Sequence, residues 1–318
     1  MFTEKQNNLV YYLFLTLCVS AIALSLAEYL SSWHRYFEFS TNYKLQYLLM
    51  SLCSLCYFLL TRRKLGIILC WFCISINLAE IVPWYFNRPP IPVAEYQSLK
   101  AFSYNVLWNN QDYDRAIALI AKEKPDIAIF QEAVPHWNPA LAALESDFPY
   151  HIRAEKLEME VYSKLPLLDP ETIVYGSYRG LIAVNLKMGD RLVKFVATHA
   201  YPQLYWGQGG WKIRNQQLQG LKRYAATSQQ PTIVMGDLNI SMWSPYYRSA
   251  IEGSGLYNAR QGFGVLPTHS IIAPQIAALS APLDHCLVSF DVRVKEFRLG
   301  PAIGSDHLPI IAELLIEA

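Results

Sequence analysis

The sequence has almost no cysteine after its first 86 residues. Five of its six cysteines lie within apolar runs near the start, and Cys286 alone falls in the remainder. A single thiol cannot form an internal disulfide, so the later part of the chain folds without one even in an oxidising compartment. The spacings Cys53-x-x-Cys56 and Cys70-x-x-Cys73 match metal or redox motifs, but in lipid-facing helices they indicate small apolar fillers.

The later part of the chain also lacks a surplus of positive charge. From Asn87 onward there are 21 Lys and Arg against 22 Asp and Glu, which gives a net charge of −1. Proteins that bind nucleic acid neutralise phosphates with Lys and Arg, so this balance gives no support to a DNA substrate. Net charge does not report distribution, and a local basic groove stays open. The sequence has no internal repeat and no low-complexity run.

The start of the chain, in contrast, is rich in long apolar runs. They occupy residues 9–30, 45–60 and 65–82. Each is near the roughly 20 helical residues that cross a bilayer, so the sequence predicts a transmembrane anchor of three helices over residues 1–86. A cleaved signal peptide is the alternative for the first run. Its apolar part should span only about 7–15 residues, and no Ala-x-Ala follows here.

The short loop 61–64 sets the expected orientation of this anchor. It carries Arg62, Arg63 and Lys64 between the second and third runs, and short loops rich in Lys and Arg stay in the cytoplasm. With three spans, Met1 is then cytoplasmic and everything after Pro83 is extracytoplasmic. The sequence predicts a multi-pass protein of the inner or plasma membrane whose remaining chain faces the periplasm, with the lipid bilayer as the partner of its N-terminal helices.

A proline-rich stretch separates the anchor from the rest. Prolines 89, 90 and 92 remove backbone donors and restrain their neighbours, so residues 87–98 are expected to form a stiff linker. Strand-like and helix-like segments then alternate, among them a helix at 113–122 and another at 135–145. Mixed sheets with helices on their outer faces are the expected packing for residues 99–318.

Small polar clusters stand at the ends of the apolar strands. They are Asn105, Gln131-Glu132, Thr198-His199, Gly236-Asp237-Leu238-Asn239, Asp284-His285 and Ser305-Asp306-His307. A buried strand tolerates a carboxylate only where a metal or a hydrogen-bond partner compensates its desolvation. Because each cluster ends a strand, we expect the six to share one site.

The residue types in these clusters restrict the chemistry. Carboxylates, carboxamides and imidazoles without thiolates suit a hard cation such as Mg²⁺ or Mn²⁺. Phosphoryl transfer needs such a cation, an oriented water and a donor for the leaving oxygen. In this scheme Glu132 binds the metal, Asp237 holds the attacking water and Asn239 orients phosphate or water. A histidine paired with a carboxylate supplies the remaining proton or the stabilisation of charge.

Taken in order, the six clusters resemble the endonuclease/exonuclease/phosphatase family, which includes deoxyribonuclease I, apurinic endonucleases, neutral sphingomyelinases and inositol polyphosphate phosphatases. Each short string is weak alone, since Gly-Asp-x-Asn also occurs as an ordinary turn, but the ordered set is specific. The resemblance covers essentially all of residues 99–318. It implies an α+β fold, a four-layer α/β sandwich with two mixed β-sheets flanked by helices.

The resemblance also implies a role for each matched residue. Glu132, Asn105 and Asp306 match the metal-binding residues, and Asn105 and Asn239 match residues that bind the scissile phosphate. The catalytic set that it implies is His199, Asp237, Asn239, Asp284 and His307, in which Asp284 hydrogen-bonds the terminal histidine. His136, His151, His269 and His285 are expected to be structural, and Arg179 to be an exposed turn residue.

The substrate is less closely defined. Aromatic residues follow two of the clusters, at 201–211 and 242–247, and are expected to rim the pocket, where they would contact substrate or lipid headgroups; core packing is the alternative. Tethering beside a bilayer favours a phospholipid or another phosphodiester slightly over nucleic acid. A DNA or RNA endonuclease and a membrane-tethered binding module without hydrolysis remain alternatives. The sequence indicates no protein partner and leaves the oligomeric state and the number of metal ions open.

Overall fold

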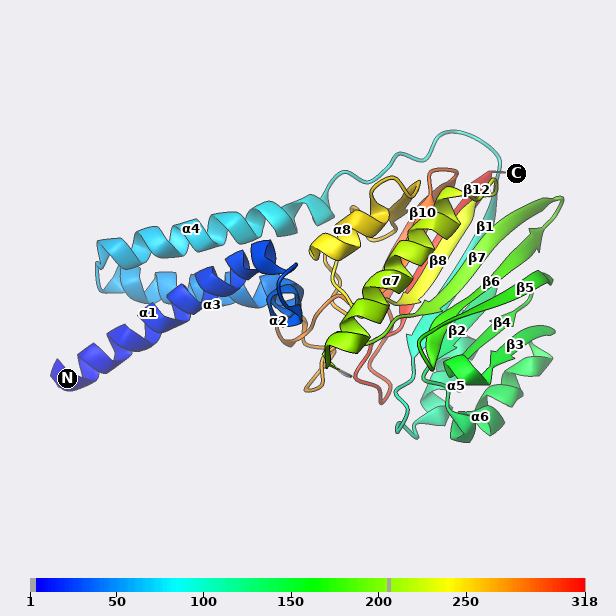
Figure 1. Ribbon diagram of the computed structural model, residues 1–318, viewed down its shortest axis with the longest axis horizontal. Coiled ribbons are helices and arrows are strands. Elements are labelled where there is room, and N and C mark those ends of the chain that lie inside the picture. The colour runs from blue at the N-terminus through cyan, green and yellow to red at the C-terminus, as the bar shows by residue number, and fades with distance from the viewer. Residues whose placement is uncertain (1–3, 205–206, 318) are drawn as a thin grey trace.

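The molecule has two ends of different architecture (Figure 1). The computed structural model describes residues 4–204 and 207–317. Helices from the start of the chain form a bundle at one end, and two β-sheets with helices on their outer faces form the other. Met1, which the sequence predicts to be cytoplasmic, lies outside the described residues.

The bundle contains three helices long and apolar enough to cross a membrane, as the sequence predicts. They are α1 (Glu4–Leu26), α3 (Lys44–Leu60) and α4 (Lys64–Ile81). Short helices join or extend them: η1 (Ala27–Leu30), α2 (Arg35–Phe39), η2 (Ser40–Tyr43) and η3 (Val82–Tyr85). With these extensions the apolar spans run over Gln6–Leu30, Arg35–Leu60 and Lys64–Tyr85.

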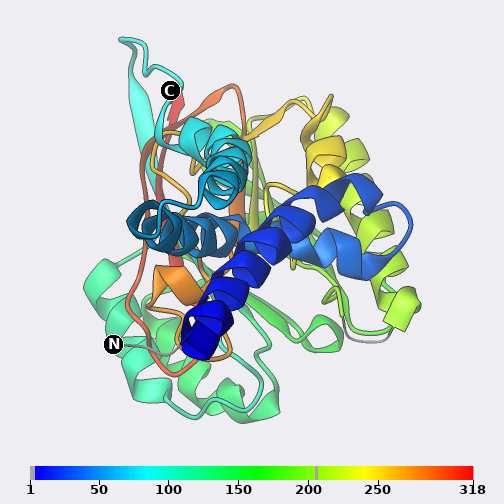
Figure 2. The same cartoon turned by 90° about the vertical axis from the view of Figure 1, so that its left-hand side faces the viewer.

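Apolar side chains cover the outside of the bundle. Large residues such as Leu13, Leu60 and Ile68 are exposed on it. An apolar surface of this extent marks contact with a membrane or another protein. The turn between α3 and α4, which carries Arg62 and Arg63, lies at the end of the bundle far from the sheets. Figure 2 views the molecule from the side of the bundle, with the three long helices in front of the sheets.

The remaining chain forms two six-stranded sheets. In order across the first sheet the strands are β11 (Val292–Leu299), β12 (Ile310–Glu317), β1 (Tyr96–Asn105), β2 (Ile127–Gln131), β4 (Met159–Ser163) and β3 (Tyr150–Ala154). In the second they are β5 (Leu167–Tyr175), β6 (Arg179–Met188), β7 (Arg191–His199), β8 (Thr232–Asp237), β10 (Asp284–Ser289) and β9 (Leu256–Asn258). β1 and β2 are parallel, as are β7 and β8, while the other neighbours are antiparallel, so both sheets are mixed.

Helices complete the outer layers of the sandwich. On the first sheet they are α5 (Tyr113–Glu123), η4 (Pro135–Trp137), α6 (Asn138–Ala142) and η5 (Ala143–Ser146), and on the second they are α7 (Gly207–Ala226) and α8 (Pro245–Ile251). Two further short helices, η6 (Glu155–Leu157) and η7 (Ala277–Leu279), lie in connecting loops. One apolar core lies between the two sheets. A second core lies under α5 and α6, and a third under α7 and α8. This arrangement confirms the predicted four-layer α+β sandwich with an N-terminal anchor.

The helix α5 shows why a helix on the outer face of a sheet can be predicted from the sequence. Its apolar residues recur at helical spacing, and Ala116, Leu119 and Ile120 are buried against the first sheet. Its last turn closes at Lys124, whose left-handed backbone (φ 49°) lets its N–H donate to the Ile120 carbonyl oxygen at 2.8 Å. The predicted helix at 113–122 therefore matches the observed one to within one residue.

Two predicted boundaries were wrong. The segment expected as one helix at 135–145 is divided into η4, α6 and η5. Pro135 and Pro139 each stand in the first turn of a piece, where a missing backbone donor is tolerated, and neither allows a helix to run through it. The strand β1 begins at Tyr96, inside the segment 87–98 that was predicted to be linker.

Candidate active site

The centre of each sheet brings polar side chains to the same edge of the sandwich. Asn105 ends β1 and Glu132 follows β2, while His199 ends β7 and Asp237 ends β8. The strands in each pair are parallel, so their carboxyl ends coincide, and His199 pairs in register with Asp237. The two central pairs thus deliver four of the predicted residues to one place.

Two antiparallel strands contribute the other predicted groups. Asp284 begins β10 and lies directly opposite Asp237 on β8. His307 comes shortly before β12, which is antiparallel to β1, so it reaches the same edge from the first sheet. His285, next along β10, points the other way and bonds to Asn258 at 2.9 Å. The alternation of a strand thus selects Asp284 for the site.

Gly236 allows the two sheets to meet behind this site. Its φ is +146°, and an added Cβ would lie 1.9 Å from the carbonyl oxygen of Thr198 and 3.0 Å from the side-chain nitrogen of Gln131. Gln131 belongs to the first sheet and Thr198 to the second. Only glycine fits where backbone and side chains from both sheets approach so closely.

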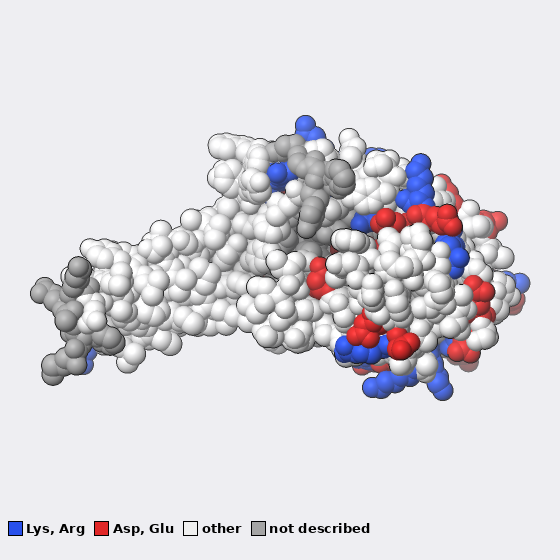
Figure 3. Space-filling model, turned by 90° about the horizontal axis from the view of Figure 1, so that it is seen from below, with Lys and Arg blue, Asp and Glu red and all other residues white. Residues whose placement is uncertain are grey.

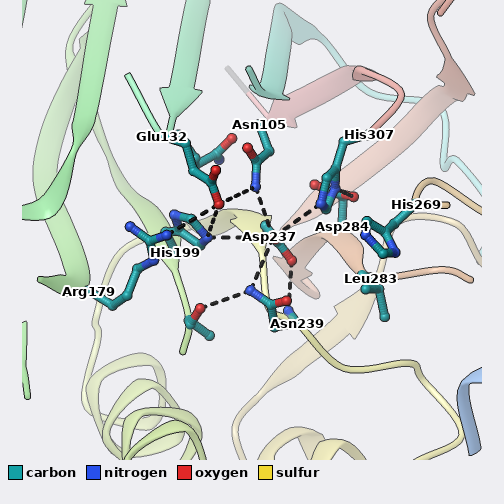
Figure 4. Close-up of polar contacts among 12 residues, drawn as sticks. Asn105, Glu132, Arg179, His199, Asp237, Asn239, His269, Leu283, Asp284 and His307 are labelled. Atoms are coloured by element: carbon teal, nitrogen blue, oxygen red, sulfur yellow. Dashed lines mark hydrogen bonds and ion pairs between the residues drawn. The ribbon is translucent and has the colours of Figure 1, made fainter. Parts of the chain in front are cut away.

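Asp237 lies at the centre of the cluster (Figure 4). Its Oδ2 accepts hydrogen bonds from Asn105 Nδ2 at 3.2 Å and Asn239 Nδ2 at 3.1 Å, and its Oδ1 accepts one from the Asn239 backbone at 2.7 Å. Asn239 has a left-handed backbone (φ 51°), which turns its amide back toward the carboxylate. Burial raises the pKa of Asp237 to about 7, against the opposing effect of His307. The carboxylate can therefore exchange a proton near neutral pH.

His307 lies between two carboxylates. Its Nδ1 bonds to Asp284 Oδ2 at 2.8 Å, and its Nε2 lies 3.7 Å from Asp237 Oδ2. Burial favours the neutral imidazole, but the charges of Asp284 and Asp237 outweigh burial and raise the pKa of His307 to about 10. Burial also acts against ionised Asp284, yet the charge of His307 lowers the pKa of that carboxyl below its usual value. Asp284 thus holds a protonated imidazole in place.

His199 is buried too, but its protonation state differs from that of His307. Burial lowers its pKa well below the usual value, and the positive charges of Arg179 and His307 act in the same direction, so the imidazole is neutral. Its Nε2 lies 3.5 Å from Asp237 and 3.8 Å from Glu132. Within the described parts of the chain neither ring nitrogen has a hydrogen-bond partner. A buried polar group of this kind calls for a ligand or a water.

Glu132 borders the cluster beside an arginine. Its Oε1 lies 3.3 Å from Asn105 Nδ2 and 3.2 Å from Arg179, and its Oε2 accepts from the Trp108 backbone at 3.1 Å. Glu132 also has a left-handed backbone, with φ of 56°. Arg179 was expected to be an exposed turn residue, and this was wrong. It is 5% exposed and also pairs with Glu158 at 2.8 Å.

Asp306 and His269 form the other side of the site. The carboxylate of Asp306 lies 3.4 Å from His269 Nε2, and the rings of His269 and His307 are 4.6 Å apart between centroids. Ser305 Oγ links this side to the first, since it lies 2.7 Å from the Asn105 carbonyl oxygen and 3.3 Å from Asp306 Oδ1. His269, expected to be structural, thus faces the site. It follows no strand, so the pattern that marks the other residues could not identify it.

The donor set at the site fits a hard divalent cation. His269, Asp306 and His307 offer ligand atoms within 4.8 Å of one another, as do Asp237, Asp284 and His307. The potential ligands are carboxylates and imidazoles, and no cysteine is among the described residues that line the site. Such sets suit Mg²⁺ or Mn²⁺. Asn105 turns its amide nitrogen toward Glu132 and Asp237, while its Oδ1 accepts from the Leu107 backbone, so as a metal ligand it would need its amide rotated by half a turn.

The cluster opens onto one pocket of about 770 Å³, whose described lining does not include the buried Asn105, His199 and Asp284. Asp237, Asn239, His269, Asp306 and His307 all contribute to its wall. The wall also includes three residues from the anchor that were not predicted to lie there: Phe39, Asn42 and Tyr43.

The aromatic residues that were expected to rim the pocket are mostly buried elsewhere. Tyr201, Trp211, Trp243 and Tyr247 are at most 7% exposed and do not line it. Trp211 Nε1 donates to Glu38 and Trp243 Nε1 donates to the Glu80 carbonyl oxygen, so two of them fasten the anchor. Core packing, the alternative reading, describes them better. Tyr205 and Trp206 lie outside the described residues.

Solved structures with the same fold include several enzymes. A family protein from Bacteroides thetaiotaomicron has 16% identity and a TM-score of 0.59, covering 70% of this chain and 100% of that one. Sphingomyelinase C from Streptomyces griseocarneus has 20% identity and a TM-score of 0.52, covering 68% and 99%. TDP2 from D. rerio complexed with a single-strand DNA product has 16% identity and a TM-score of 0.58, covering 69% and 99%. At these identities the likeness shows a shared fold.

Family membership rests on the sequence. No curated protein matches the chain. The model of the Endonuclease/Exonuclease/phosphatase family, however, matches residues 102–307, which span every cluster described above. The chain therefore belongs to the endonuclease/exonuclease/phosphatase family, whose members are phosphoester hydrolases that depend on a divalent metal ion.

Proposed function

We propose that this protein is a membrane-anchored, Mg²⁺-dependent phosphodiesterase. Residues 1–86 serve as the anchor, 87–95 as the linker and 96–318 as the catalytic domain, since β1 begins at Tyr96. The observation that carries the proposal is the convergence on one pocket of a buried carboxylate at Asp237, the Asp284–His307 pair and the acidic side chain of Glu132. A binding module would have no need of a buried acid with a pKa near 7 beside a protonated imidazole.

The metal ligands of this proposal are the ones that the family resemblance implies: Glu132, with Asn105 and Asp306, would hold the ion. When bound, the ion supplies Lewis-acid stabilisation of charge on a nonbridging phosphate oxygen. The other groups of the pocket then bind, orient and exchange protons.

Asp237 and Asn239 are placed to hold the attacking water. Asn239 fixes the carboxylate with one hydrogen bond from its backbone N–H and one from its side-chain amide. Asp237 lines the pocket and serves as the proton acceptor. The water oxygen forms a bond to phosphorus as its proton passes to Asp237. The pKa of about 7 fits a general base near neutral pH.

His307 provides the balancing proton. Its Nε2 faces the pocket while Asp284 holds Nδ1. As the phosphorus–oxygen bond to the leaving group breaks, His307 gives its proton to the departing oxygen. Asp237 lies 3.7 Å away and can return the proton taken from water, so each cycle consumes one water and leaves the enzyme unchanged.

We propose that this chemistry takes place outside the cytoplasm. The basic turn between α3 and α4 lies at the opposite end of the bundle from the catalytic domain. If that turn stays in the cytoplasm, the catalytic domain lies on the other face, in the periplasm or its equivalent. Two substrate classes suit the site there, because the similar structures include a sphingomyelinase and a protein bound to a single-strand DNA product.

A generic substrate tests the proposed activity. The full-length protein in detergent is assayed with Mg²⁺ and bis(4-nitrophenyl) phosphate, alongside His307→Ala and Asp237→Asn. Each variant should lose a factor of about 10² to 10⁴ in kcat, the usual contribution of a general acid or base.

Two matched control variants test whether such substitutions lower activity when they are made away from the pocket. His151→Ala and Asp147→Asn change the same residue types at exposed positions outside the pocket and should retain full activity. Equal rates for the wild type, His307→Ala and Asp237→Asn would refute the enzymatic proposal.

A further inference from the structure

The anchor is clamped onto the catalytic domain by a buried carboxylate. We define the docking segment as residues 38–43, which lie between α1 and α3. Glu38 of this segment is completely buried. Its carboxylate accepts hydrogen bonds from four side chains of the catalytic domain: Arg214 (2.5 and 2.7 Å), Trp211 (2.5 Å), Ser244 (2.7 Å) and Gln203 (2.9 Å). A buried charge with this many partners fixes the segment in one place.

The same contacts reach the catalytic loop after β8. Arg214, held by Glu38, donates from Nη1 to the Asn239 carbonyl oxygen at 3.2 Å. Asn42 of the docking segment accepts from the Ser241 backbone N–H at 3.1 Å. The anchor therefore holds the loop of Asn239 at two points and is a structural part of the active site.

Apolar side chains of the docking segment enter the pocket wall. Phe39 and Tyr43 line the same cavity as Asp237 and His307. The loop 270–280 of the catalytic domain adds three more apolar residues to this wall: Ile271, Ile272 and Leu279. The pocket thus combines polar catalytic groups with an apolar wall built by two parts of the chain.

This loop also lies beside the end of a membrane helix. Gln46, in the first turn of α3, donates to the Ser280 carbonyl oxygen at 2.9 Å, and η7 contacts α3. Ile271 and Ile272 are 83% and 77% exposed. Exposed apolar side chains next to a membrane-spanning segment insert favourably into the boundary of the bilayer. The pocket wall is therefore continuous with a surface suited to lipid.

Positive charge in the pocket is too sparse for a nucleic-acid backbone. Of the described residues that line it, Arg179 is the one Lys or Arg, and Glu132 and Glu158 both pair with it. Binding along a polynucleotide needs several unpaired Lys or Arg. Figure 3 shows the charged residues of one face gathered in mixed groups on the catalytic domain, with a nearly uncharged surface over the anchor.

We propose that the pocket binds a phosphodiester that carries a long apolar tail, as a membrane lipid does, and that Phe39 and Tyr43 of the anchor are specificity-determining residues for that tail. This inference rests on the proposed phosphodiesterase function. The phosphate lies at Asp237 and His307, and the tail lies along the apolar wall toward Ile271 and Ile272. The bond broken is the phosphorus–oxygen bond described above.

A pair of chromogenic substrates tests this proposal. Methyl and dodecyl 4-nitrophenyl phosphate share a leaving group and differ only in the tail. The full-length protein is assayed on both in one detergent with Mg²⁺, and the ratio of kcat/KM (dodecyl over methyl) is compared between variants, so partition of the substrate into micelles cancels. The double variant Phe39→Ser/Tyr43→Ser should lower this ratio by about fivefold or more, since it removes apolar contact area.

Two further variants keep the result interpretable. Ile271→Ser/Ile272→Ser changes side chains that are exposed and unimportant for folding, and it should lower the ratio as well. Tyr36→Ser changes an exposed aromatic residue of the anchor outside the pocket and should leave the ratio unchanged. A thymidine oligonucleotide should be cleaved more slowly than the dodecyl ester.

The outcomes separate this inference from the proposed function. If the wild type hydrolyses neither ester, the phosphodiesterase proposal itself fails. If the wild type hydrolyses both, but neither double variant changes the ratio, the tail subsite is refuted while the activity stands. Preference for the oligonucleotide over the dodecyl ester would also overturn the subsite and identify a nuclease.

Discussion

Asp284 controls the protonation state of His307. The two side chains share a bond of 2.8 Å, and the negative charge of Asp284 is the largest effect that raises the pKa of His307 to about 10. His307 is protonated below its folded pKa, so activity that needs the proton is lost as the pH rises through that value. Asp284→Asn removes the charge and should move this alkaline limb of kcat to lower pH, with a loss of about 10² in kcat.

A pH profile of kcat checks this prediction. Asp291→Asn, in the exposed turn between β10 and β11, is the matched control and should keep the wild-type profile. An unmoved alkaline limb in Asp284→Asn would mean that His307 does not act as the proton donor.

The site also depends on Gly236, because a side chain at this position would clash with its neighbours. Alanine at this position would place Cβ 1.9 Å from the Thr198 carbonyl oxygen, in a backbone conformation with φ of +146°. We expect Gly236→Ala to cost at least about 3 kcal/mol, from overpacking and backbone strain together. Thermal unfolding of the full-length protein measures this. Gly209→Ala, where an added Cβ has nothing within 4 Å, should show no loss, and equal stability of the two variants would contradict the account.

The site residues differ in how well they can be predicted from the sequence. Asp237 and Glu132 stand at the ends of buried strands. A polar residue there is conspicuous in the sequence because a buried strand is otherwise apolar. Arg179 begins β6, yet its role depends on Glu132 and Glu158, which lie 47 and 21 residues away along the chain. A single arginine before a strand carries no sign of such partners. His269 likewise faces the site only because of contacts with residues that are distant in the sequence.

At the scale of elements, one ion-pair cluster ties α5 to both β1 and β11. Glu123 at the end of α5 bonds to Arg298 at 2.5 Å and Lys100 at 2.8 Å. Burial works against the ionised Glu123, but the hydrogen bonds from Arg298 and Lys100 outweigh it and lower the pKa of Glu123 below its usual value of 4.5. Its contribution to stability is therefore present above the unfolded pKa and is lost as the pH falls through the folded pKa.

Glu123→Gln should show this dependence directly. Near neutral pH the variant should be about 1 kcal/mol less stable than the wild type, a modest value because Arg298 and Lys100 are partly exposed. In strongly acidic buffer the difference should shrink. Unfolding curves at both pH values measure it, and Glu95→Gln at an exposed position provides the control. A difference independent of pH would show that Glu123 acts through packing alone.

Elements were predictable where burial imposes a pattern. The central strand β2 is fully buried and reads as a short apolar run, and α5 shows one apolar face. The strands β3, β9 and β11 are harder to predict, and all three are edge strands. Edge strands are short or carry charged residues such as Arg153 and Lys295, which weakens the alternation on which a prediction depends. The division of 135–145 was missed because its apolar spacing alone suggests one helix.

At the scale of the molecule, the anchor and the catalytic domain pack as neighbours in one structure. Ile81 of α4 joins the core under α7 and α8, and Arg248 of α8 pairs with Glu80 at 3.3 Å. Sequence predicted the two parts but not their contact. Glu38 and Arg214 are 176 residues apart, and each alone reads as an ordinary surface charge. The pocket is thereby held in a fixed position relative to the long apolar helices of the anchor.

The proposed orientation of the whole molecule is based on its basic turn. Alkaline phosphatase, which is active only outside the cytoplasm, should be active when fused to the C-terminus. The same reporter inserted in the turn at 61–64 should be inactive. The opposite pattern would place the catalytic domain in the cytoplasm and invalidate the topology proposed above.

The central claim is that acids, amides and imidazoles from two sheets act together on one phosphorus atom through a metal-assisted attack by water. It is tested most directly by hydrolysis of bis(4-nitrophenyl) phosphate in H₂¹⁸O by the full-length protein, before EDTA treatment, after it, and after Mg²⁺ is restored. We predict that EDTA abolishes turnover, that Mg²⁺ restores it in the wild type but not in Asp237→Asn, and that the label appears on the phosphorus of 4-nitrophenyl phosphate. Label in the released 4-nitrophenol, or turnover indifferent to EDTA and to Asp237→Asn, would contradict the account.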